Sequence, residues 1–221
     1  MATPVVVFDV NETLSDLTPL ASRFAAVGAP PELAATWFAA VLREGFAIGA
    51  AGDFVRFATI AEWQARVLLH GRRLDRPTED AVGHVLAGFG ELTVHPDVAD
   101  GVRALAAAGV RMVTFSNGAA AVAERLLDRA GVRYAFEALL SVEDAGVWKP
   151  AAAAYRYVAR ACGTDPDGLL MVAVHPWDLH GAARAGLRTA WLDRDGAPYP
   201  DYCARPDHVV RSVAELVAAV E

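Results

Sequence analysis

The chain has 221 residues, 54% of them hydrophobic, and a formal net charge of −7. This length fits one large domain, or a core with a smaller module, and allows a sizeable hydrophobic core. An acidic chain without a basic stripe argues against nucleic acid as a partner.

Features of membrane insertion and secretion are also missing from the sequence. No apolar run approaches the roughly 20 residues that span a bilayer, and residues 1–4 do not begin a secretory leader. Cys162 and Cys203 are the only cysteines, which is too few for a disulfide framework. The sequence therefore predicts a protein of the reducing cytoplasm that contacts no membrane.

The first predicted element is a buried strand over residues 4–10, where three valines and a phenylalanine lead into Asp9. Asp9 falls at the carboxyl end of this strand, where open α/β sheets place their ligands. A carboxylate there is costly unless it is paired, which indicates a working group. The alternative is that Asp9 simply caps a turn.

Residues 15–90 have a helical pattern and contain no good strand candidate. Apolar residues recur at helical spacing over 34–42, 54–69 and 78–89, and Gly45 and Gly49 weaken the first of these helices. Three or four helices before any second strand predict an all-α insertion.

The remainder of the chain alternates strands with helices, which predicts βαβ units and a doubly wound parallel sheet of the α/β class. The predicted core comprises residues 1–14 and 91–221. Its later strands are expected at 110–115, 138–141, 169–174, 189–192 and 209–210, and its helices at 96–108, 118–130, 151–162, 177–185 and 213–220.

Polar residues follow three further strand or loop segments. Ser116-Asn117-Gly118 offers a hydroxyl, an amide and backbone N–H groups to an anion, or is an ordinary helix N-cap. Lys149-Pro150 precedes a helix, and a lone lysine there is often just solvated. In His175-Pro176-Trp177-Asp178 the aspartate can be a cap and the tryptophan part of the core.

Together these four segments resemble the four motifs of the haloacid dehalogenase (HAD) superfamily. The resemblance covers essentially the whole chain and implies that residues 15–90 form the family's cap domain. Asp9 with Thr13, then Ser116, Lys149 and Asp178 match the motifs in order.

Within the superfamily the sequence is more similar to the metal-independent 2-haloacid dehalogenases than to the phosphatases. Phosphatases have an acid two positions after the nucleophile, and this chain has Asn11 there. Phosphatases also have paired acids in the last motif, where this chain has His175 three residues before Asp178. Losing these acids removes the oxygen ligands that magnesium needs. Ser116-Asn117-Gly118, Lys149-Pro150 with Tyr155, and Trp177-Asp178 match the dehalogenase motifs.

The resemblance implies a role for each matched residue. Asp9 would displace the halide, and Lys149 would keep Asp9 ionised. Ser116 and Thr13 would bind Asp9 or the substrate carboxylate, while Tyr155 and Asp178 would support Lys149 and the hydrolytic water. Further substrate-binding positions are Asn11, Asn117, Arg43, and the apolar walls Leu42, Phe57 and Trp177.

Three positions depart from the family pattern. Phe38 stands where the family has the arginine that receives the halide. The nearest arginine, Arg43, lies five residues later and about 140° around the helix from position 38. Arg43 either binds the halide or faces solvent. Asn11 replaces an aromatic residue. His175 replaces an asparagine, and it either activates water beside Asp178 or is satisfied by a backbone carbonyl.

The sequence thus predicts a hydrolase that acts on small 2-halocarboxylates through an ester on Asp9, without metal or other cofactor. The resemblance also allows a homodimer. One alternative is another HAD hydrolase, such as a phosphatase of small phosphate esters. The other is a catalytically lapsed protein that only binds an anion.

Overall fold

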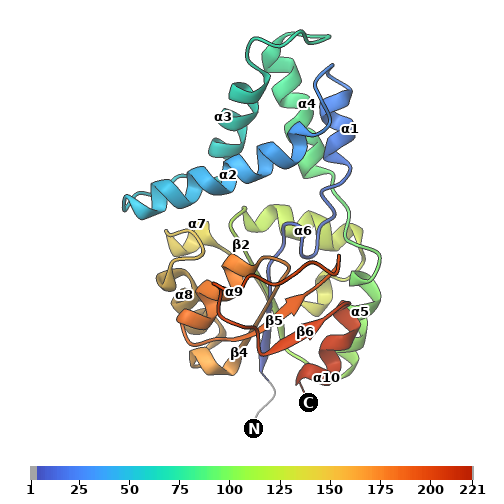
Figure 1. Ribbon diagram of the computed structural model, residues 1–221. Coiled ribbons are helices and arrows are strands. Elements are labelled where there is room, and N and C mark those ends of the chain that lie inside the picture. The colour runs from blue at the N-terminus through green and yellow to red at the C-terminus, as the bar shows by residue number, and fades with distance from the viewer. Residues whose placement is uncertain (1–3, 221) are drawn as a thin grey trace. The chain divides into compact units, whose positions relative to one another are not determined.

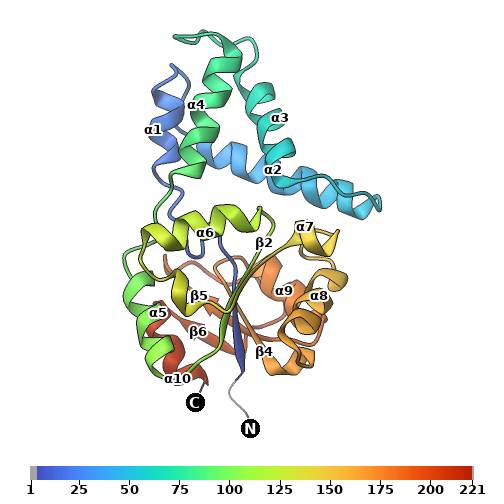
Figure 2. The same ribbon diagram turned by 180° about the vertical axis from the view of Figure 1, so that it is seen from behind.

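The computed structural model describes residues 4–220, which divide into two compact units (Figures 1 and 2). One unit contains residues up to Ser15 together with those from Thr93 onward, and the other spans Asp16–Leu92.

The first unit is built on a six-stranded, wholly parallel sheet in the order β3-β2-β1-β4-β5-β6. This confirms the predicted α/β doubly wound fold. The strands are β1 (Val5–Phe8), β2 (Met112–Ser116), β3 (Ala138–Ser141), β4 (Leu169–Ala173), β5 (Arg188–Leu192) and β6 (His208–Val210).

Helices cover both faces of this sheet (Figures 1 and 2). On one face α5 (Val98–Ala107), α6 (Ala120–Arg129) and α10 (Leu216–Val220) bury apolar residues such as Val102 and Leu126 against Phe8 of β1. On the other face lie α8 (Ala152–Cys162) and α9 (Pro176–Arg184). A short α7 (Val142–Ala145) follows β3.

The strand order reverses between β1 and β4, whose neighbouring positions include Val6 and Leu170. In open α/β sheets ligands bind beyond the carboxyl ends of the strands at such a switch point. Asp9 follows β1 directly, and α9 with Asp178 begins soon after β4. The topology therefore brings two of the predicted motifs to one edge of the sheet.

The second unit is helical and consists of α1 (Leu20–Ala25), α2 (Leu33–Ala50), α3 (Phe57–Leu69) and α4 (Thr78–Gly90). The second of these helices is longer than the predicted 34–42, because α2 runs on through Gly45 and Gly49. Glycine costs only about 1 kcal/mol in a helix, and burial of Trp37, Phe38 and Val41 outweighs it.

Within residues 4–220, α2 is the single helix long and apolar enough to cross a membrane by length and composition. It is weak evidence for a span, because packed helices of folded domains satisfy the same criteria.

Candidate active site

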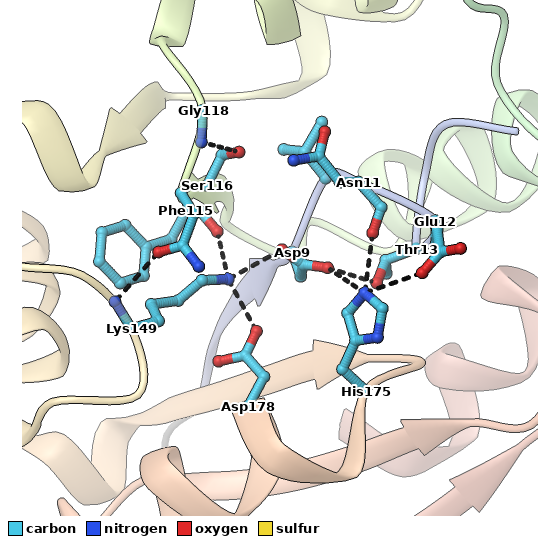
Figure 3. A network of polar contacts seen from close by, with 12 residues as sticks. Asp9, Asn11, Glu12, Thr13, Phe115, Ser116, Gly118, Lys149, His175 and Asp178 are labelled. Carbon is cyan, nitrogen blue, oxygen red and sulfur yellow. Dashed lines mark hydrogen bonds and ion pairs between the residues drawn. The ribbon is translucent and has the colours of Figure 1, made fainter. Parts of the chain in front are cut away.

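The centre of the site is an ammonium group held between two carboxylates (Figure 3). Nζ of Lys149 donates to Oδ1 of Asp9 at 2.8 Å, to Oδ2 of Asp178 at 2.7 Å and to the carbonyl oxygen of Phe115 at 2.9 Å. Lys149 and Asp178 are fully buried, and the side chain of Asp9 is 5% exposed. All three hydrogens of the ammonium group are therefore used, as burial of a charge requires.

The charges of this cluster stabilise one another. Burial alone lowers the pKa of Lys149, but the carboxylates of Asp178 and Asp9 outweigh it and raise the pKa above its usual value. Burial raises the pKa of Asp178, Lys149 opposes this, and the charge of Asp9 adds to it. Lys149 is consequently a permanent cation beside Asp9.

Both carboxylate oxygens of Asp178 accept hydrogen bonds. Its Oδ1 lies 2.6 Å from the hydroxyl of Tyr155, which also lies 2.9 Å from the carbonyl oxygen of Asp178. Burial, and then the charge of Asp178, raise the pKa of Tyr155 well above its usual value, so that this hydroxyl stays a donor. The contacts of Asp178 thus place it as the partner of Lys149.

The second carboxylate oxygen of Asp9 is held by Thr13. The hydroxyl of Thr13 donates to Oδ2 of Asp9 at 2.7 Å and accepts from the backbone N–H of Val174 at 3.2 Å. The turn after β1 is therefore tied to the end of β4, and Asp9 is fixed at both oxygens.

The Ser116-Asn117-Gly118 segment lies ahead of α6, whose N-cap is Ala119, so Ser116 and Asn117 do not cap that helix. Oγ of Ser116 accepts from the N–H of Gly118 at 2.9 Å, and Oδ1 of Asn117 accepts from the N–H of Lys149 at 3.0 Å. Nδ2 of Asn117 is buried and has no hydrogen-bond partner in the part of the chain that the structure describes.

The lysine lies in a loop ahead of the predicted helix. The Lys149–Pro150 peptide bond is cis, and α8 begins at Ala152, within one residue of the predicted start. Lys149 therefore reaches the site from a loop that Asn117 anchors.

His175 and Glu12 adjoin the nucleophile (Figure 3). Nε2 of His175 lies 3.2 Å from the carbonyl oxygen of Asn11, 3.5 Å from Oε2 of Glu12 and 3.8 Å from Oδ2 of Asp9. The ring stacks on Trp177 with 5.2 Å between centroids. A nitrogen that faces three oxygens carries its hydrogen, so this atom is a donor and not the acceptor that water activation would need.

Three predicted substrate-binding residues belong to the helical unit. Arg43 is exposed and Leu42 is half-buried on α2. Phe57 is buried, with its ring stacked on Phe89 at 5.4 Å between centroids.

Two contributions to the site were not anticipated from the sequence. The carbonyl of Phe115 is a backbone group, which sequence patterns cannot single out. Glu12 could have been noticed as a third polar residue in the turn after Asp9, but a charged residue in a turn is ordinary.

The residues do not fit a magnesium site of the kind that the phosphatase branch uses. The two buried carboxylates, which would be the hard oxygen ligands, are already bridged by the ammonium group of Lys149. Among residues 4–220 no group of three or more His, Cys, Asp or Glu side chains is arranged to hold a metal ion.

Comparison with known proteins agrees with this geometry. The chain is 29% identical over 215 residues to an (S)-2-haloacid dehalogenase of Pseudomonas putida, covering 96% of this chain and 93% of that protein. It is 28% identical over 220 residues to another from Pseudomonas sp. strain YL, covering 98% and 94%.

Solved structures share the fold. L-2-haloacid dehalogenase from Xanthobacter autotrophicus, solved with chloropropionic acid covalently bound, matches with a TM-score of 0.86 at 24% identity over 98% of both chains. The family model for haloacid dehalogenase-like hydrolases matches residues 3–186. The chain therefore belongs to the haloacid dehalogenase-like hydrolase family.

Proposed function

We propose that the protein hydrolyses small (S)-2-haloalkanoic acids to 2-hydroxy acids without a metal ion. The observation that carries this proposal is the Asp9 carboxylate, which is ion-paired with the buried Lys149 ammonium group that also bridges it to Asp178. Relatives of 28% and 29% identity that match nearly the whole chain are named (S)-2-haloacid dehalogenases.

In the first step a carboxylate oxygen of Asp9 attacks C2 of the substrate, and the C–halogen bond breaks as the halide leaves with its electron pair. Thr13 and Lys149 orient the carboxylate for this attack, which supplies the proximity that accelerates a displacement. Attack from the side opposite the halide would invert C2 and give the (R)-2-hydroxy acid.

The substrate carboxylate requires donors near Asp9. The hydroxyl of Ser116, whose oxygen already accepts from Gly118, retains its hydrogen for donation. The unpartnered Nδ2 of Asn117 is a second donor. We assign both groups to the substrate carboxylate.

The resemblance to the family suggests the roles of the residues that would surround the rest of the substrate. Residues of the helical unit, including Leu42 and Phe57, would cover the substrate as a cap, and Trp177 would line the carbon chain. A cytoplasmic location and a homodimer stay predictions from the sequence.

Halide release tests the proposal. Purified protein is given the (S)- and (R)-2-chloropropionates with and without EDTA, and p-nitrophenyl phosphate with Mg²⁺ in parallel. We expect chloride release from the (S) substrate that is insensitive to EDTA and absent in Asp9→Asn. Phosphate release that EDTA abolishes, without any halide release, would instead support the phosphatase alternative.

A further inference from the structure

Glu12 adopts a backbone conformation that is unfavourable for its residue type. Its φ is +63°, and among residues 4–220 it is the only non-glycine residue with positive φ. Glycine would adopt this conformation without a steric penalty. Strained backbone of this kind persists mainly where the side chain has a function, and Glu12 lies three residues after the nucleophile.

The side chain of Glu12 shares a partner with the nucleophile. Oε2 of Glu12 and Oδ2 of Asp9 lie 3.5 Å and 3.8 Å from the same atom, Nε2 of His175 (Figure 3). The side chain of Glu12 is 43% exposed, whereas that of Asp9 is 5% exposed. A water molecule beside His175 would thus be within reach of both carboxyl groups, and Glu12 connects this position to solvent.

Hydrolysis of the ester requires a base, because the attacking water has to lose a proton. Asp178 is poorly suited to accept that proton, since it is fully buried and its two oxygens are engaged by Lys149 and Tyr155. Lys149 is a cation, and Nε2 of His175 is a donor. Among these groups around Asp9, the carboxylate of Glu12 is the most exposed, at 43% against 13% for His175 and 0% for Lys149 and Asp178.

We propose that Glu12 is the general base of the second half-reaction, in which the Asp9 ester is hydrolysed, and that His175 donates to the oxyanion formed there. This inference rests on the proposed dehalogenation. The environment supports it: burial raises the pKa of Glu12, His175 opposes this, and the charges of Asp9 and Asp195 add to it, which makes the carboxylate a stronger base.

In this step the water oxygen bonds to Cγ of Asp9 as one water proton passes to Glu12. Negative charge develops on Oδ2, which faces the hydroxyl of Thr13 and Nε2 of His175. The bond from Cγ to Oδ1 then breaks, and the departing alkoxide, beside Lys149, takes the proton back from Glu12. The products are the 2-hydroxy acid and Asp9, whose acid proton goes to solvent.

Rapid-quench kinetics with (S)-2-chloropropionate test this role. Glu12→Gln should keep the burst of one halide per site at near wild-type rate, while steady-state kcat falls by about 10²–10⁴-fold. The aspartyl ester should accumulate and be detectable by mass spectrometry of the peptide that contains Asp9. Asp128→Asn, on an exposed part of α6, removes a distant carboxylate and serves as the control.

A second variant separates a loss of catalysis from a loss of folding. Glu12→Gly relieves the left-handed conformation, so its Tm should rise while its turnover falls as in Glu12→Gln. Added formate should partly restore turnover of the glycine variant. A Glu12→Gln enzyme with wild-type steady-state kcat, or one in which burst and turnover fall equally, would overturn the inference. Absence of any chloride release from (S)-2-chloropropionate by the wild type would instead reject the proposed function.

Discussion

Asp9 is held at both carboxylate oxygens, by the ammonium group of Lys149 at Oδ1 and by the hydroxyl of Thr13 at Oδ2. Thr13 lies only four positions after Asp9, whereas Lys149 lies 140 positions away, so it is the contact with Lys149 that depends on the folded core. A carboxylate that is held in this way is suited to attack carbon, and formation of an ester distinguishes covalent catalysis from direct attack by water.

The ester can be detected by isotope labelling. In a single turnover in H₂¹⁸O with enzyme in excess, we expect ¹⁸O in the carboxyl group of Asp9 and none in the hydroxy acid, because water opens the ester at Cγ. Mass spectrometry of the Asp9 peptide and of the product measures both. Multiple turnovers, the control, should then carry label into the product. Label in the product of the first turnover would mean that water attacks the substrate directly.

At the scale of elements, α9 approaches the lysine loop closely because it has glycine at position 181. A Cβ atom at Gly181 would lie 2.6 Å from Cβ of Pro150 and 2.7 Å from the hydroxyl of Tyr155. The absence of a side chain there lets Tyr155 reach Asp178, which in turn holds Lys149. The contact is therefore part of the support of the site, although Gly181 itself has no chemical role.

Gly181→Ala should consequently destabilise the protein by about 1–3 kcal/mol through overpacking and lower kcat by displacing Tyr155. The matched control is Gly83→Ala on α4, where a Cβ would meet nothing within 4 Å. That change should raise stability by about 0.5–1 kcal/mol through the better helix propensity of alanine. Urea denaturation and halide release measure the two effects. Equal stability of the two variants would show that the close contact has no consequence.

Arg43, which the sequence predicts as a halide-binding residue, belongs to helix α2. Phe38 stands at the usual arginine position and is buried, whereas Arg43 is the one cationic residue of the helix and is exposed. A halide leaving carbon develops negative charge, which a nearby cation stabilises in the transition state.

We therefore expect Arg43→Ala to lose about 10²–10³-fold in kcat with a smaller change in KM, and Arg43→Lys to retain part of the activity. Steady-state chloride release from (S)-2-chloropropionate measures both variants. A near-normal kcat in Arg43→Ala would reject the role and leave the halide to a neutral donor such as the indole of Trp177.

For the whole molecule, the buried cluster of Lys149, Tyr155 and Asp178 makes the free energy of unfolding depend on pH in the alkaline range. Carboxylates hold the pKa of Lys149 above its ordinary 10.5 despite burial, and burial together with Asp178 holds that of Tyr155 well above 10.0. At a pH below these ordinary pKa values, both protonated groups contribute their full stabilisation of the folded state. This stabilisation is lost as the pH rises toward and through the higher pKa values of the folded state, because the unfolded chain releases its protons first.

The free energy of unfolding should thus decline as the pH passes about 10, which urea titrations from roughly pH 8 to 11.5 would measure. Tyr155→Phe should make this decline shallower, since Lys149 is then the one member of this cluster that still contributes. An unfolding free energy that stays constant across this range would contradict the linkage.

The sequence by itself determined the α/β class and the parallel sheet, because strands buried on both faces are apolar runs and the helices between them repeat at 3.6 residues. It also located the four segments whose motifs carry Asp9, Ser116, Lys149 and Asp178, since each places polar residues at the end of a strand, at the start of a helix or in the loop before one. Strand ends were predicted within two residues where β-branched runs were clear, as for β1 and β4.

Only the tertiary structure decided which partners these residues have. Asp178 accepts a hydrogen bond from Lys149, and Asn117 anchors the loop that carries this lysine. His175 faces Glu12 and Asp9. These contacts join residues 29 to 166 positions apart or depend on the left-handed turn at Glu12. Local patterns report burial and periodicity, whereas a hydrogen-bond partner is set by where the strand order reverses and how helices pack across it. The same reason explains why α2 extends beyond the predicted residue 42, since its packing overrides the weak helix propensity of Gly45 and Gly49.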